Sequence, residues 1–142
     1  MTDQALTQLV AELFIAIRML SGYAIPEDRP PVFRLQRAAL ESMVCRGACG
    51  VKAFYLAGKG VYIDETLDLN NDIKARSILL HELVHHVQGV TGKFADMPDC
   101  HGWYAKEYEA YAIQNKYLRW EGSGVSFYMD AGWRDCRHEM ND

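Results

Sequence analysis

The chain has 142 residues, of which 49% are hydrophobic and 24% are charged, and its formal net charge is −4. This composition is typical of a soluble globular protein, and we expect one domain over residues 1–142. Nucleic-acid-binding proteins carry a basic patch or stripe, and the sequence has none. No apolar run approaches the roughly 20 residues that span a bilayer, so we expect neither a nucleic-acid partner nor a membrane span.

Residues 5–20 are largely apolar but lack the pattern of a secretory signal. The segment follows Met-Thr-Asp-Gln rather than basic residues, and Glu12 and Arg18 interrupt it. Its large apolar residues recur at helical spacing, at positions 6, 9, 10, 13, 14, 17 and 20. The pattern predicts an amphipathic helix that ends near Gly22, because glycine suits a helix C-cap.

The remaining elements follow a proline-rich connection at residues 25–31. The patterns predict a short strand at 32–35, a helix at 36–44 and a β-hairpin of strands 51–56 and 61–64. A long helix at 73–90 begins after Asn71 or Asp72 as N-cap, and a second long helix at 103–120 ends before Gly122. A loop at 93–101 joins them, and a short apolar run at 125–129 precedes a last helix at 131–139. The expected fold class is α+β, with helices packed on a small hairpin or sheet.

Four cysteines are an even number, which in a small chain indicates disulfides in an oxidising compartment. Three pairings are possible, and we favour Cys45 with Cys49 and Cys100 with Cys136. If these disulfides form, the protein is expected to be periplasmic or secreted. The alternative is four reduced thiols in a cytoplasmic protein. A zinc site made of cysteines is disfavoured because no C-x2-C pair occurs.

The 73–90 helix carries His81-Glu82-Leu83-Val84-His85. Advancing 100° per residue places His85 about 40° from His81, and the apolar residues of the helix lie on the opposite face. The apolar face is expected to hold the helix against the core, so that the two imidazoles lie side by side and can share one Zn²⁺. Glu82 lies at about 100°, where a carboxylate reaches a water molecule at the metal without being a ligand. The alternative is an exposed helix face that holds two histidines and a glutamate by chance.

A catalytic zinc site needs a third protein ligand and an open position. The candidates are Glu107, Glu109, His101, His86, His138 and Asp64. Glu107 and Glu109 lie about 160° apart on the 103–120 helix, so both are not expected to serve. We favour Glu109, because Ala105, Ala112 and Ile113 flank it and two small residues let the helices approach closely. Glu107 shares its face with Trp103, Tyr111 and Gln114, which we expect to hold the helices apart.

These motifs resemble the gluzincin branch of zinc metallopeptidases, since Glu109-Ala110 follows 24 residues after His85. Residues 45–120 also resemble small bacterial zincin-like proteins, at Cys49-Gly50, Tyr62-Ile63-Asp64-Glu65, Arg76-Ser77-Ile78-Leu79, His85-His86-Val87-Gln88 and Glu109-Ala110-Tyr111. The resemblance implies a minimal zincin-like fold with Zn²⁺ as cofactor. It implies that His81, His85 and Glu109 are the zinc ligands and that Glu82 is the general base. The implied reaction is the hydrolysis of a peptide or protein substrate by a metal-activated water.

The sequence departs from the gluzincin pattern at Ile113, where many members carry a carboxylate that orients a ligand histidine. Hydrogen bonds of this kind orient and tune metal ligands. The role is expected to pass to Gln114, Asn115 or a backbone carbonyl. The alternative function is a zincin-fold module that binds zinc for interaction without turnover. Retention of Glu82 favours catalysis, because a structural zinc site does not need it.

Two features bear on the substrate. The 51–64 hairpin lies just upstream of the metal helix, where an edge strand would bind an extended peptide by β-augmentation. Asp64 and Glu65 follow it, and we hypothesise that they favour basic substrates. The candidate donors to an oxyanion are Tyr104, Tyr108, Tyr111, Tyr128 and His101, and the pattern favours none of them. No oligomeric state is indicated.

Overall fold

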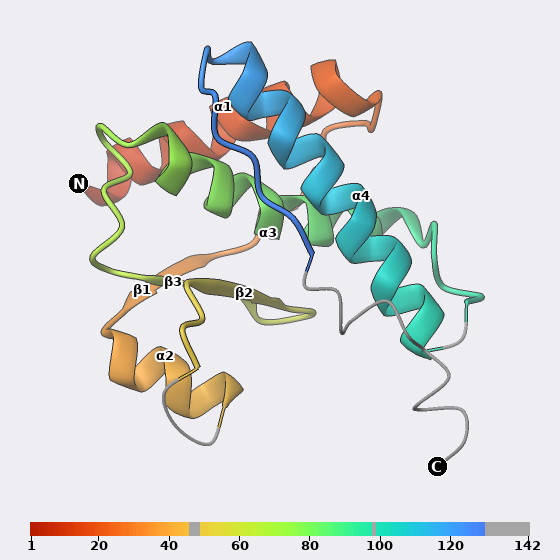
Figure 1. Cartoon of the computed structure of the whole chain (residues 1–142), viewed down its shortest axis with the longest axis horizontal. Coiled ribbons are helices and arrows are strands. Elements are labelled where there is room, and N and C mark those ends of the chain that lie inside the picture. Colours follow the sequence, from red (N-terminus) through yellow and green to blue (C-terminus); the bar gives the residue numbers. More distant parts are fainter. Residues whose placement is uncertain (46–48, 98, 130–142) are drawn as a thin grey trace.

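The structure, a computed structural model, describes residues 1–45, 49–97 and 99–129. Within these residues the elements are α1 (Asp3–Ser21), β1 (Val32–Leu35), α2 (Arg37–Val44), β2 (Ala53–Leu56), β3 (Gly60–Asp64), α3 (Ile73–Thr91) and α4 (Asp99–Trp120). The fold class is α+β, as predicted (Figure 1). The helix predicted at 131–139 lies outside the described residues.

The described strands form a three-stranded mixed sheet in the order β1-β3-β2. The predicted hairpin is confirmed, because β2 and β3 pair in antiparallel register, and β1 pairs with β3 in parallel. Gly60 begins β3 with φ 142°, and an added Cβ there would lie 2.4 Å from the carbonyl oxygen of Pro31. Glycine therefore permits the close approach that lets Val61 donate its N–H to Pro31. β2 is left as an edge strand of the sheet.

The sheet separates α2 from the other three helices (Figure 1). Val61 and Ile63 of β3 are fully buried and belong to the core cluster that the helices α1, α3 and α4 share. Tyr62 alternates with them and stacks between Phe33 and Phe54, at ring-centroid distances of 5.0 and 4.9 Å. The period-two pattern of β3 thus gives the sheet two different faces.

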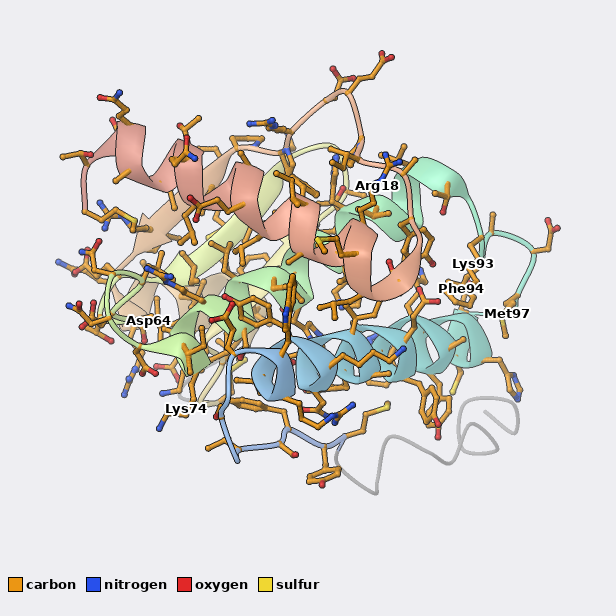
Figure 2. The ribbon with its side chains drawn as sticks, turned by 90° about the horizontal axis from the view of Figure 1, so that it is seen from above. Arg18, Asp64, Lys74, Lys93, Phe94 and Met97 are labelled. Atoms are coloured by element: carbon orange, nitrogen blue, oxygen red, sulfur yellow. A yellow bond between two sulfur atoms is a disulfide. The ribbon has the colours of Figure 1, made fainter. Side chains whose placement is uncertain are left out.

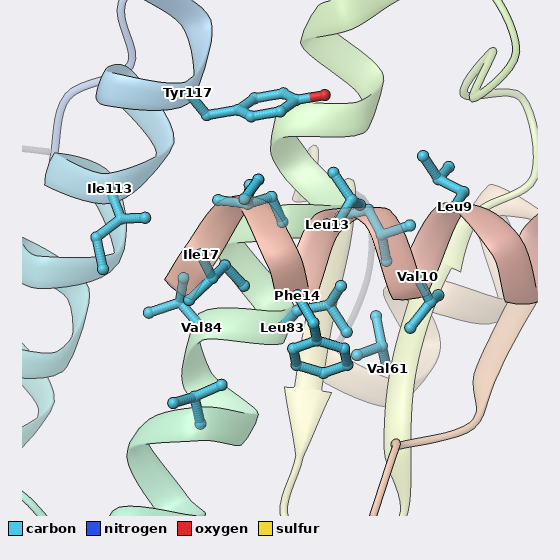
Figure 3. Close-up of a cluster of buried hydrophobic side chains, with 14 of the residues drawn as sticks. Leu9, Val10, Leu13, Phe14, Ile17, Val61, Leu83, Val84, Ile113 and Tyr117 are labelled. Atoms are coloured by element: carbon cyan, nitrogen blue, oxygen red, sulfur yellow. The ribbon is translucent and has the colours of Figure 1, made fainter. Parts of the chain in front are cut away.

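Helix α1 covers the core from one side (Figure 3). Its N-terminus is capped by the Thr2 hydroxyl, which accepts from the Ala5 N–H, and it ends at Gly22 in the left-handed conformation, as predicted. The helix is long and apolar enough to cross a membrane, a test that buried core helices also pass. Its apolar face packs against the core through residues that include Leu9, Val10, Leu13, Phe14 and Ile17.

Helix α3 lies at the centre of the molecule, packed against α1, the strands and α4. Asp72 caps its start by accepting from the Lys74 N–H, and Gly92 ends it in the left-handed conformation. Leu79, Leu80 and Leu83 are fully buried, and each contributes about 2 kcal/mol by leaving water. This burial holds the helix that carries the histidines in place.

Helix α4 begins at Asp99, four residues earlier than the predicted start at Trp103, so the predicted loop at 93–101 is shorter. The acidic Asp99 in the first turn suits the positive end of the helix dipole. Gly102 is buried against Met97, which lies with Lys93 and Phe94 beside the start of the helix (Figure 2). The tight connection brings α4 back along α3.

A disulfide joins Cys45 and Cys49 after α2, as predicted. The Glu41 carboxylate accepts from the N–H groups of Cys49 and Gly50, at 2.5 and 3.1 Å, and ties the same segment to α2. The other predicted disulfide, between Cys100 and Cys136, includes a cysteine outside the described residues.

Candidate metal centre

His81 and His85 project side by side from α3 toward α4. Their rings are 4.9 Å apart between centroids and nearly perpendicular. The side chains are 7% and 13% exposed, so the two histidines are largely shielded from solvent. The helical spacing of the two histidines therefore produces the adjacency that the sequence predicts.

Glu107 of α4 completes the group. Its two carboxylate oxygens lie 3.0 Å from Nε2 of His81 and 2.7 Å from Nε2 of His85. One ligand atom from each of the three residues lies within 4.8 Å of the others, a spacing that suits a shared metal ion. Two histidines and a carboxylate are a donor set that zinc accepts.

The expectation that Glu109 is the third ligand is corrected by this geometry. The buried residues of α4 form a stripe along the helix. Glu107 lies at the edge of this stripe nearest the histidines, and Glu109 lies at its other edge. Tyr111, expected to hold the helices apart, instead lies edge-on against His81 at 4.4 Å between centroids. Tyr111 is thus part of the wall of the site, and it does not prevent Glu107 from reaching the histidines.

Glu109 binds other polar groups. It accepts from Nε2 of Gln88 at 3.1 Å and from the hydroxyl of Tyr23, and it forms an ion pair with Lys93 at 2.5 Å. Burial alone would raise the pKa of Glu109, but these donors, above all Lys93, lower it. Glu109 is therefore a charged residue beside the site and not a ligand.

Two glutamines hold the outer nitrogens of the histidines. Oε1 of Gln114 lies 2.9 Å from Nδ1 of His81, and Oε1 of Gln88 lies 2.9 Å from Nδ1 of His85. Gln114 is one of the groups expected to replace the carboxylate missing at Ile113, and it does so for His81. Gln88 was not among them, although its position three residues, about one turn, after His85 on α3 was a signal for it.

Nε2 of His85 tests whether the residues fit a metal. It is buried and has no hydrogen-bond partner among the described residues. The Glu107 oxygen lies 2.7 Å away, but no hydrogen bond joins the two atoms. A buried nitrogen that faces a carboxylate without a partner is what an absent cation would leave, so the three side chains fit a zinc ion.

Glu82 lies against the group without joining it, as the sequence predicts. Its carboxylate is 3.9 Å from Nε2 of His81. The residue is 8% exposed, and this burial raises the pKa of Glu82 against the lowering effect of His81 and His85. A carboxylate of raised pKa at this position suits a proton acceptor.

The ionisable groups of the site shift one another's pKa values. Burial alone would raise the pKa of Glu107, but the contacts with His81 and His85 lower it to about 2. Burial alone would lower the pKa of His85, but the carboxylates of Glu107 and Glu82 raise it. The carboxylate thus stays ionised and ready to meet a cation.

Two cavities flank the group. One, of about 430 Å³, lies beside His85 and Glu107 and is lined by residues that include Tyr55, Gly89, Phe94, Trp103 and Lys106. The other, of about 290 Å³, lies beside His81 and Glu82 and is lined by residues that include Val51, Ala53, Tyr111 and Phe127. Residues in and next to the edge strand β2 line both, so the strand runs from one cavity to the other.

The other candidate ligands lie elsewhere. His86 binds the Tyr55 hydroxyl and the Asp28 carbonyl, His101 is exposed, and His138 is outside the described residues. Asp64 is buried at the end of β3, where Arg37 and Thr66 donate to it. Its carboxylate is therefore a structural group, which corrects the hypothesis of basic substrate preference for Asp64, while the same hypothesis for exposed Glu65 stays a prediction.

The tyrosines proposed as donors to an oxyanion are also separated by the structure. Tyr104 and Tyr108 stack on each other, and Tyr128 is 79% exposed. Tyr111 alone among the described candidates contacts a metal-site residue, through its ring on His81. Burial, with help from Glu107 and Glu82, raises the pKa of Tyr111, so its hydroxyl keeps its proton.

A family model covers nearly the whole of this architecture. It matches residues 4–133 and is described as a domain of unknown function, DUF6647. The chain belongs to the DUF6647 family. No protein with a curated description and no solved structure matches it.

Proposed function

We propose that the protein is a zinc-dependent peptidase in which His81, His85 and Glu107 hold the metal and Glu82 is the general base. The observation that carries the proposal is the convergence of three ligand atoms within 4.8 Å, with a buried carboxylate beside them that is not a ligand. A purely structural zinc site needs four protein ligands and no such carboxylate, whereas a catalytic site keeps one position open.

Zinc bound there would supply a Lewis acid that polarises the scissile carbonyl and lowers the pKa of water towards about 7. Glu82 accepts the proton of the attacking water at its carboxylate and then gives it to the nitrogen of the leaving amine. The Tyr111 hydroxyl is the best-placed candidate donor to the developing oxyanion.

The surroundings of the group support an extended peptide as substrate. β2 is an edge strand whose free side offers backbone groups for pairing, and the two cavities lie at either end of it. Tyr55, Phe94 and Trp103 wall the cavity beside His85, so it suits a large apolar side chain of the substrate.

The second candidate function is a zinc-binding interaction module without turnover. It is supported by the donor set alone, because two histidines and a carboxylate can hold zinc whether or not a substrate is cleaved there. The two functions share the metal site and differ in what Glu82 does.

The test combines metal analysis with a peptide-library cleavage assay on the wild type and on Glu82→Gln. One zinc per chain, with cleavage that disappears in the variant, is expected for the peptidase. Glu121→Gln is a matched control, since it removes an exposed carboxylate at the end of α4. Stoichiometric zinc without cleavage would favour the interaction module, and no zinc after reconstitution would contradict both.

We also propose that the protein works in an oxidising compartment, periplasmic or extracellular. The support is the Cys45–Cys49 disulfide, because cysteine thiols stay reduced in reducing compartments. Mass spectrometry of protein from its natural source, alkylated before and after reduction, tests this. Alkylation of both thiols without reduction would overturn it.

A further inference from the structure

The side chain of Gln88 connects the proposed metal site to Glu109. Gln88 is 2% exposed, and all of its polar atoms have partners. Its Oε1 lies 2.9 Å from Nδ1 of His85, and its Nε2 donates to the carbonyl of Lys106 at 3.0 Å and to Oε1 of Glu109 at 3.1 Å.

These partners determine which way the amide points. A carbonyl and a carboxylate only accept hydrogen bonds, so the NH₂ end of Gln88 must face Lys106 and Glu109. The oxygen end then faces His85, and it accepts only if Nδ1 carries a proton. In the neutral ring the lone pair is therefore on Nε2, the nitrogen that faces Glu107.

Glu109 is itself held from two other parts of the chain. The hydroxyl of Tyr23, in the connection after α1, donates to the oxygen that Gln88 also binds. Lys93, in the connection between α3 and α4, pairs with the other oxygen at 2.5 Å. The acceptor that meets Gln88 is thus fixed in place before any metal arrives.

We infer that Glu109 is a positioning residue of the metal site: through Gln88 it sets the tautomer of His85 that presents Nε2 as a ligand. The inference rests on the proposed function for the ligand role of His85. The carboxylate that gluzincins place at the position of Ile113 is absent, and here Gln88 of α3 and Glu109 of α4 together orient His85.

Loss of the acceptor at Glu109 has a definite consequence. One N–H of a buried amide would lose its partner, which is costly inside a protein. Gln88 would then rotate or exchange its two ends, and an NH₂ group facing His85 would favour a proton on Nε2 instead of Nδ1. Removal of such an orienting partner lowers metal affinity by about 10- to 100-fold.

The experiment measures the zinc dissociation constant by competition with a chromophoric chelator, for full-length Glu109→Met and Glu109→Gln. Methionine is similar in size but accepts no hydrogen bond from the amide, whereas glutamine keeps an acceptor oxygen. We expect Glu109→Met to weaken zinc binding about tenfold or more and Glu109→Gln to stay within about threefold of the wild type. Glu121→Met is the control, because it replaces an exposed glutamate at the end of α4, and it should bind zinc like the wild type.

A second measurement does not depend on metal. Two-bond ¹⁵N–¹H correlation spectra of the metal-free wild type, taken with the ring neutral, report which nitrogen of His85 carries the proton. We expect the Nδ1–H form in the wild type and in Glu109→Gln, with the Nε2–H form gained in Glu109→Met. An Nε2–H form in the wild type, or equal zinc affinity in Glu109→Met and Glu109→Gln, would overturn the inference. Absence of zinc binding by the wild type would overturn the proposed function, and the spectra would still decide how Gln88 and His85 are arranged.

Discussion

Nε2 of His85 on α3 and the carboxylate of Glu107 on α4 face each other at 2.7 Å without a hydrogen bond between them. The same carboxylate reaches His81 with its other oxygen, so one glutamate closes the pair of histidines from the neighbouring helix. This relationship connects α3 and α4 through the atoms that a metal would bind. It also makes the choice of glutamate on α4 open to direct test.

Replacement of Glu107 by alanine should abolish high-affinity zinc binding. The change removes a charged ligand and leaves two histidines, so we expect the affinity to fall about 100-fold or more. Competition with a chelator measures it, with Glu121→Ala as a control at the exposed end of α4. Zinc bound equally well by Glu107→Ala and the control would show that the ligand lies elsewhere.

Replacement of Gly89 by leucine should restrict the cavity beside His85. Gly89 lies within α3 without a positive φ, and an added Cβ there meets no atom within 4 Å, so the side chain can enter the cavity without a clash. If the cavity receives a substrate side chain, cleavage of peptides with a large aromatic residue there should fall about tenfold or more, and peptides with small residues should be spared.

The control for this change is Val90→Leu, one residue along and 60% exposed. Both variants should fold, and Gly89→Leu should gain about 0.5–1 kcal/mol in the free energy of unfolding because glycine is a poor helix former. A cleavage profile that is the same in Gly89→Leu and Val90→Leu would contradict the assignment of the cavity.

Asp64 should make stability depend on acid pH. Burial alone would raise its pKa, but the hydrogen bonds from Thr66 and Arg37 lower it. A lowered pKa in the folded state contributes stability that is present above the unfolded pKa of about 3.9 and is lost as the pH falls through the folded value. Asp64→Asn should therefore lower the free energy of unfolding by about 2 kcal/mol at neutral pH.

Urea denaturation at several pH values, at constant metal content, measures this difference. The gap between the wild type and Asp64→Asn should shrink below about pH 4. Glu65→Gln changes the exposed neighbour and should show no such trend. A gap that stays the same from pH 7 to pH 3 would contradict the role of the buried carboxylate.

Reduction of the Cys45–Cys49 disulfide should destabilise the protein modestly. The bridge closes a short loop, for which the chain-entropy argument gives about 2 kcal/mol. Cys45→Ser combined with Cys49→Ser should lower the free energy of unfolding by that amount. Zinc affinity should be unchanged, since neither cysteine lines the metal group. Loss of zinc binding in the double variant would show that the segment supports the site.

The sequence predicted the elements well because their signals are local. Helical periodicity and an N-cap at Asn71 or Asp72 predicted α3 to within one residue at each end, and the β-rich run 61–64 predicted β3. Helix α4 was placed four residues late, since Pro98 and His101 read as a loop in the sequence. The parallel pairing of β1 with β3 had no local signal, because it depends on the crossover through α2.

The choice between Glu107 and Glu109 shows where local reasoning stops. Their positions on the helix surface were correct, but which one meets the histidines depends on the rotation of α4 about its own axis. The useful signal was Gln114, a buried polar residue that lies two helical turns after Glu107 on nearly the same side of α4. A polar side chain in such a place needs a partner, and its partner is His81.

The contact between Tyr23 and Glu109 spans 86 residues of the chain. Contacts of such long range form only after the chain has closed a large loop, so they arise late in folding. The helices α3 and α4 on their own would carry every proposed ligand but would lack the contact from Tyr23 to Glu109. Zinc is thus expected to load onto an already folded protein rather than to nucleate its folding, and the N-terminal quarter of the chain is what makes the site ready to receive it.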